Sequence, residues 1–156
     1  MSRSKDSGPR KIAVNRSAFR DYHVLDRITA GIELRGTEIK SIRGGAVSLS
    51  GSYADVENNQ CFLRHMHVAQ YEFAGPFNHE PLRDRRLLLH SREITRLHSA
   101  TEQKGHTLIP LHLFFQGDYL KVELGICRGK TFSDKRETIR RKDADREAER
   151  AMRRRS

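Results

Sequence analysis

Histidine and cysteine are the residue types in this sequence that could hold a metal ion. His65 and His67 alternate on a predicted strand and Cys61 lies four residues earlier, so all three side chains are expected on one strand face. The spacing matches no standard zinc signature and offers no fourth ligand. We therefore expect half-buried strand residues here, with no metal and no other cofactor. Isolated cysteines also indicate a reducing, cytoplasmic environment.

The sequence shows no pattern that indicates catalysis. No serine lies in a G-x-S-x-G context, and Gly44-Gly45 lacks the Lys-Ser/Thr of a phosphate-binding loop. Glu33 and Glu38 flank Gly36 and are not expected to face each other as an acid and base pair. We predict that the protein is not an enzyme. An RNA-modifying enzyme that uses Glu38 with a histidine remains an alternative.

Basic residues point instead to a polyanionic partner. The 156 residues include 30 Lys and Arg against 20 Asp and Glu, a formal charge of +10. Separate basic groups lie where the chain is expected to turn: Arg16 with Arg20, Lys40 with Arg43, and Arg83 with Arg85 and Arg86. Aromatic side chains that could stack on bases are few: Phe19, Tyr22, Tyr53, Tyr71, Phe73, Phe77 and Phe132. This pattern favours RNA recognition by shape and backbone over base-by-base readout.

The excess positive charge is concentrated at the two ends of the chain. Residues 1–11 have four cations and one anion, and residues 134–156 have ten cations and six anions. Neither segment can bury enough apolar surface to order itself. We expect a flexible arm at 1–11, a folded domain at 12–133, and a basic tail at 134–156. The tail has a helical composition, so we expect it to be disordered when free and helical on a polyanion.

Turn signals divide the middle of the chain into elements. Expected strands are 22–34, 52–57, 60–68, 107–116 and 119–128, and expected helices are 37–43 and 82–103, with Thr37 as a cap and a possible break near His90. Asn58-Asn59 and Gly117-Asp118 predict hairpin turns, and Pro110 predicts a strand edge or bulge. The chain is thus predicted to be mostly β: a small antiparallel OB-fold-like barrel with about three short helices. An α+β sandwich is the alternative. No apolar run is long enough to cross a membrane, and no signal peptide is expected.

Dispersed sequence blocks resemble one known family. They are Asn15-Arg16, Asp21-Tyr22, AGIELRGTEIKSIRGG at 30–45, Ser52-Tyr53-Ala54, RLLLHSREI at 86–94, GHTLIPL at 105–111, Gly129-Lys130, and DKR at 134–136. In this order they resemble the SsrA-binding proteins (SmpB), partners of transfer-messenger RNA (tmRNA).

The resemblance implies an OB-type barrel and an adaptor role in ribosome rescue. Its expected partners are the tRNA-like domain of tmRNA, the ribosome (16S rRNA, decoding centre and mRNA channel), elongation factor Tu, and, indirectly, alanyl-tRNA synthetase. The adaptor would aid alanylation of tmRNA and accompany it to the vacant A site. The tail would become helical in the empty mRNA channel. A general ribosome-associated or single-strand RNA-binding module remains the alternative.

The resemblance also implies which residues face RNA. They are Asn15, Arg16, Glu38, Lys40 and Arg43 on the body, and Gly129, Lys130, Asp134, Lys135 and Arg136 at the junction with the tail. Because a carboxylate repels phosphate, Glu38 is expected to orient Lys40 or Arg43 or to support the structure; the alternative is that it accepts a hydrogen bond from a guanine edge or an RNA 2′-OH. Thr29, Thr131 and Ser133 differ from the residues usual in the family at these positions.

Overall fold

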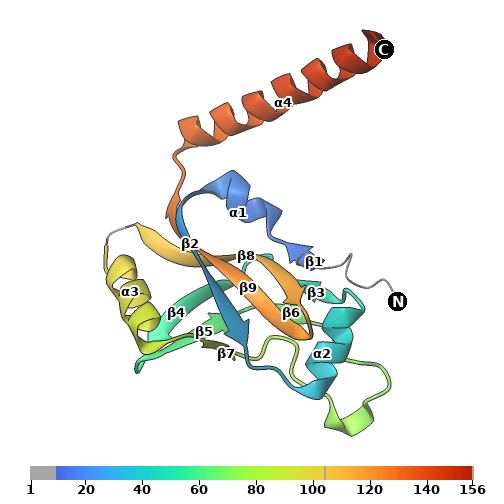
Figure 1. The fold of residues 1–156 in the computed structure, drawn as a ribbon, viewed down its shortest axis with the longest axis vertical. Helices are drawn as coiled ribbons and strands as arrows, with labels where there is room; N and C mark the ends of the chain where they lie inside the picture. The colour runs from blue at the N-terminus through green and yellow to red at the C-terminus, as the bar shows by residue number, and fades with distance from the viewer. Residues whose placement is uncertain (1–9, 104, 156) are drawn as a thin grey trace.

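The structure, a computed structural model, describes residues 10–103 and 105–155 (Figure 1). Its strands are β1 (Arg10–Val14), β2 (Tyr22–Ile32), β3 (Val47–Ser48), β4 (Tyr53–Glu57), β5 (Gln60–Arg64), β6 (His67–Val68), β7 (Arg85–Leu88), β8 (His106–Gln116) and β9 (Tyr119–Gly129). Its helices are α1 (Arg16–Asp21), α2 (Gly36–Arg43), α3 (Ser91–Thr101) and α4 (Phe132–Arg155), with a 3₁₀ turn η2 (Gly75–Phe77). Residues 1–9, most of the predicted arm, lie outside the described residues, and β1 already begins at Arg10.

Antiparallel pairing closes most of the strands into a ring. Hydrogen bonding runs from β8 through β4, β5, β7, β2 and β9 and returns to β8. β1 pairs farther along β8, where Arg10 lies opposite Phe115, while β3 and β6 form a small separate sheet. The described chain is therefore a mixed α/β protein with a strand-rich antiparallel sheet. The predicted antiparallel strands and short helices are confirmed.

The two predicted hairpins are present because their turns are encoded locally. Asn58 and Asn59 have φ values of 52° and 60° between β4 and β5, the left-handed pair that a two-residue hairpin turn requires. Gly117 has a φ of 62° between β8 and β9. The β8–β9 register shifts between Pro110 and His112, so the predicted bulge is also confirmed.

The prediction for residues 82–103 was wrong in its first part. Residues Arg85–Leu88 form strand β7, and only Ser91–Thr101 are helical, so the chain breaks at His90 as the sequence allowed. Arg85 and Leu87 are buried while Arg86 and Leu88 are exposed, an alternation of period two that fixes a strand. Thr37 is not the cap of α2 either. The helix begins after Arg35, whose N–H donates to Glu38 Oε1 at 2.8 Å.

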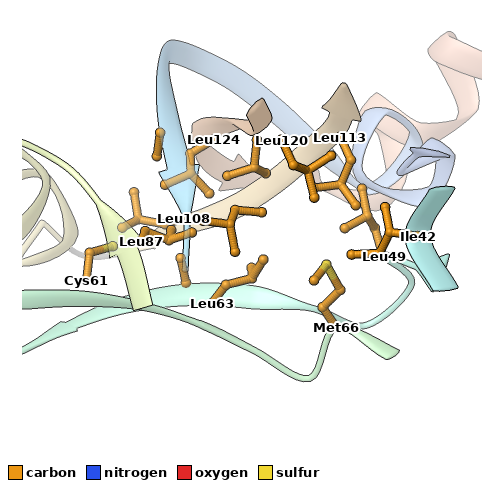
Figure 2. Packing of buried hydrophobic residues seen from close by; sticks show 14 of the residues in the cluster. Ile42, Leu49, Cys61, Leu63, Met66, Leu87, Leu108, Leu113, Leu120 and Leu124 are labelled. Atoms are coloured by element: carbon orange, nitrogen blue, oxygen red, sulfur yellow. The ribbon is translucent and has the colours of Figure 1, made fainter. Parts of the chain in front are cut away.

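The hydrophobic core lies inside the ring of strands (Figure 2). Leucines of β8 and β9, among them Leu108, Leu113 and Leu124, face Leu63 of β5 and are fully buried. At one end of this core lies Ile42 of α2, also fully buried. Packing of Ile42 therefore fixes the helix that carries Lys40 and Arg43.

Helix α4 extends away from the sheet beyond α1 (Figure 1). Helix α4 covers almost all of the tail expected at 134–156 and starts two residues before it, at Phe132. Among the α4 side chains that the structure describes, the large apolar ones are Ile139 and Met152, which are 50% and 72% exposed. In the described ranges, no helix combines the length and apolar character needed to cross a bilayer.

Candidate nucleic-acid interface

The first turn of α2 is anchored by a buried carboxylate. Glu38 is completely buried and accepts hydrogen bonds from Arg83 Nη2 at 2.6 Å and Arg85 Nε at 2.5 Å. Arg85 is also completely buried, and its guanidinium donates to the carbonyl oxygens of Met66 at 2.7 Å and Pro81 at 3.2 Å. These contacts join α2 to strand β7 and to the segment that precedes β7.

Glu38 stays ionised in this environment. Burial alone would raise its pKa, but hydrogen bonds from Arg83 and the Arg35 N–H, together with the charge of Arg85, outweigh that effect and hold the pKa below its ordinary value. The negative charge of the ionised carboxylate is therefore balanced inside the protein by the positive charges of Arg83 and Arg85. It does not face solvent, and its partners are Arg83 and Arg85 and not the expected Lys40 or Arg43.

The basic group at Arg83, Arg85 and Arg86 was wrongly predicted to open a helix, and it is largely engaged within the protein. Arg85 is inside the protein, and the side chain of Arg83 is 24% exposed and bonded to Glu38. Arg86 is exposed on β7 but pairs with Glu33 at 2.8 Å. This group therefore serves mainly to hold α2 in place.

Exposed cations lie at the last turn of α2. Lys40 Nζ is 5.3 Å from the centroid of the Tyr71 ring, and Arg43 Cζ is 5.5 Å from that of Phe115. Arg10 of β1 lies over the same Phe115 ring at 5.8 Å. We call Arg10, Lys40 and Arg43 the α2 patch. The aromatic rings support these side chains while their residues stay exposed to solvent.

Arg10 was missed as a candidate. Its neighbours in the sequence indicate only a basic arm, and nothing local shows that β1 pairs with β8. That pairing places Arg10 opposite Phe115, more than a hundred residues away in the chain, and so beside Arg43.

Asn15 and Arg16 are adjacent in sequence but differ in environment. Asn15 is only 3% exposed; its Nδ2 donates to the carbonyl of Pro110 at 3.0 Å, and its Oδ1 accepts from Ser17 Oγ at 2.9 Å. The Asn15 side chain also caps α1 by accepting from the Ala18 N–H. Arg16, the first residue of the helix, is exposed. Asn15 therefore positions α1, and Arg16 is the side chain available to a ligand.

The junction with the tail is joined to α1. Gly129 ends β9 opposite Tyr22, and the Lys130 N–H donates to the Asp21 carbonyl at 2.8 Å. Lys130 Nζ donates to the Phe19 carbonyl at 3.2 Å. Arg136 is exposed on α4, while the side chains of Asp134 and Lys135 lie outside the described residues. Lys130 is thus part of the fold at the point where α4 begins.

The structure brings Lys40 and Arg43 together and adds Arg10, whereas Arg16 lies on a different helix.

In the described part of the chain, no three His, Cys, Asp or Glu side chains are grouped as metal ligands would be. Burial, with a smaller effect of Asp55, raises the pKa of Cys61 to about 12. This thiol is therefore protonated at neutral pH.

Comparison with known proteins gives one consistent match. The sequence profile described as "SmpB protein" matches residues 12–154. An SsrA-binding protein of Carboxydothermus hydrogenoformans is 53% identical over 142 residues, covering 91% of this chain and 95% of that protein. An SsrA-binding protein of Chloroflexus aurantiacus is 50% identical over 155 residues, covering 99% and 97%. A chain of the structure described as "tmRNA-SmpB: a journey to the center of the bacterial ribosome" aligns with a TM-score of 0.66 and 44% identity, covering 82% of this chain and 94% of that one.

Proposed function

The chain belongs to the SmpB family of SsrA-binding proteins, whose role is tmRNA-mediated trans-translation, and we propose that it fills this role as a non-catalytic RNA adaptor. One structural observation carries the proposal. A compact strand ring presents exposed cations on α1 and α2, while a separate, highly charged helix extends away from it (Figure 1). Two surfaces of this kind suit two different RNAs.

The body would bind the tRNA-like domain of tmRNA. In this proposal the closed pairing of β8, β4, β5, β7, β2 and β9 is an OB-type barrel, a fold whose strands and loops often bind oligonucleotides. Arg16, Lys40 and Arg43 would meet phosphates. Asn15 and Glu38 would act through them, because their own polar atoms are already bonded inside the protein. The body would thereby aid alanylation of tmRNA by alanyl-tRNA synthetase.

The tail would bind the ribosome. After delivery to the A site with elongation factor Tu, α4 would lie along 16S rRNA from the decoding centre into the empty mRNA channel. Gly129, Lys130, Asp134, Lys135 and Arg136 would form the turning point between the two RNAs. All of these steps occur in the cytoplasm, where stalled ribosomes are found.

Deleting residues 134–156 tests the separation of the two roles. We expect the truncated chain to bind the tRNA-like domain with nearly the affinity of the full chain, because the α2 patch and Arg16 remain. We expect tagging on stalled ribosomes to be lost, because the ribosome-binding element is gone. Gel shift with the tRNA-like domain and a tagging assay with stalled ribosomes measure the two effects.

Bulk tRNA is the control RNA for the binding assay. An adaptor should prefer tmRNA by a wide margin and leave it covalently unchanged. Equal binding of all RNAs would favour a general RNA-binding module, and covalent change would favour an enzyme. Normal tagging by the truncated chain would contradict the proposed role of the tail.

A further inference from the structure

Two phenylalanine rings stand exposed at the tip of one loop. Phe73 and Phe77 are 77% and 86% exposed, the highest values for large apolar side chains in the described part of the chain. Both lie in the segment between β6 and β7, which we call the aromatic loop (residues 70–79). Rings that remain in water bury no apolar surface, so this exposure does not stabilise the folded chain.

The base of the aromatic loop is firmly built. The Asn78 side chain accepts from the Tyr71 N–H at 3.0 Å and donates to the Tyr71 carbonyl at 2.7 Å, which closes the loop. His79, only 1% exposed, bridges Thr37 Oγ1 and the Val68 carbonyl, each at 2.9 Å. The two rings are thus held out from a fixed base that is itself bonded to α2.

One cation of the α2 patch, Lys40, lies directly beside the loop. Lys40 lies over the Tyr71 ring, and the Phe73 ring contacts the edge of Tyr71 with centroids 5.5 Å apart and planes at 69°. Lys40, Tyr71 and Phe73 therefore form a continuous row from cation to exposed ring. Stacking surfaces beside cations are how proteins bind unpaired nucleotides: the rings take the bases and the cations take the phosphates.

We propose that Phe73 and Phe77 stack on unpaired RNA bases while Lys40 holds the adjacent phosphate. This inference rests on the proposed function and adds a base-binding site to it. Glu72 and Glu80 are exposed nearby and weaken the attraction of the loop itself for phosphate, so stacking must supply the binding there. The bases come either from tmRNA or from ribosomal RNA, and the experiments below separate these sources.

Tryptophan fluorescence provides the first test, because the chain contains no tryptophan. If the bases come from the tRNA-like domain of tmRNA, the emission of a Phe77→Trp variant should be quenched as this RNA saturates the protein, since a base stacked on the indole quenches it. A Leu25→Trp variant is the control. Leu25 is exposed near the start of β2. Helix α2, to which the aromatic loop is bonded, follows the other end of that strand. Equal quenching at both positions would overturn the proposal.

Photo-crosslinking identifies the source of the bases. With p-azidophenylalanine in place of Phe77, crosslinks are mapped by primer extension on tmRNA alone and on stalled ribosomes that carry tmRNA. Crosslinks to unpaired tmRNA nucleotides, or to unpaired rRNA nucleotides on the ribosome only, support the proposal and assign the source. Crosslinks to protein alone, or to no RNA in either sample, overturn it.

Affinity provides a third, independent readout. Replacing both Phe73 and Phe77 by Ala should weaken binding to the crosslinked RNA by about tenfold for each ring that stacks. Phe77→Tyr should retain binding, and Leu82→Ala, which removes an exposed apolar side chain without a ring, should leave it unchanged. If the unaltered chain itself fails to prefer tmRNA, the proposed function fails. If it prefers tmRNA but the double variant binds equally well, only the stacking site fails.

Discussion

At the scale of single residues, Glu38 shows why a carboxylate can belong to an RNA-binding surface without touching RNA. It lies two residues before Lys40 and five residues, about 1.4 turns, before Arg43, so any movement of its anchor moves both cations. The anchor is strong because the carboxylate is desolvated and bonded to Arg83 and Arg85. Removing the negative charge of Glu38 would leave the buried positive charge of Arg85 without a balancing partner, and removing Arg85 would do the same to Glu38.

Glu38→Gln should therefore lower the free energy of unfolding by about 3–5 kcal/mol at neutral pH, measured by urea denaturation. The pKa of Glu38 is lower in the folded chain than its ordinary value of 4.5, so its contribution is complete above that value. It is lost as the pH falls through the lower, folded-state pKa. The difference in stability between the two proteins should shrink over the same acid range.

Glu33→Gln is the matched control, because Glu33 pairs with Arg86 while both side chains are about half exposed. Its effect should stay within about 1 kcal/mol, as for other solvent-exposed ion pairs. An equal loss of stability in the two variants would contradict the view that Glu38 is a special anchor.

Lys40→Ala should weaken binding of the tRNA-like domain and reduce the salt dependence of its binding constant. One fewer phosphate contact lowers the slope of log K against log salt by roughly one unit. Arg92→Ala, which removes an exposed cation from α3 on the other side of the sheet, should leave the slope unchanged (Figure 1). A slope that is the same for all three proteins would remove Lys40 from the interface.

At the scale of elements, what the sequence predicts depends on whether the signal is local. The Asn58-Asn59 and Gly117-Asp118 hairpins follow from a turn flanked by alternating residues, and both were predicted correctly. Strand β7 was not predicted, because an arginine such as Arg85 is expected at the surface. Only the contact with Glu38, 47 positions earlier, explains why Arg85 is buried. The burial of Glu38 has the same long-range cause.

The candidate site divides in the same way. Basic side chains on a short helix ending at glycine were sufficient to single out Lys40 and Arg43, which are exposed on α2. The sequence could not show that Asn15 is buried, since its bond to Pro110 joins segments 95 residues apart. Nor could it show that Lys130 bonds to the α1 carbonyls. Contacts between distant segments decide these roles.

At the scale of the whole molecule, body and tail obtain their order from different sources. The strand ring surrounds a leucine-rich core with little or no exposure to water (Figure 2). Every α4 residue whose side-chain burial is described is exposed, so α4 gains no comparable apolar burial. Pairs of opposite charge on one helix face contribute only about 0.2–0.5 kcal/mol each, and a helix has a costly nucleus to form.

Amide hydrogen exchange should reveal this difference directly. In the free chain, we expect β8 and β9 amides to exchange slowly and α4 amides to exchange at nearly the rate of an unfolded peptide, because local helix opening costs little free energy. Bound to a stalled ribosome, the same α4 amides should become protected, since rRNA phosphates would neutralise its arginines and stabilise the helix. The β9 amides serve as the internal reference in both states. Protection of α4 in the free chain comparable to that of β9 would mean that the tail is ordered without RNA, and the division between a folded body and a tail ordered by the ribosome would have to be abandoned.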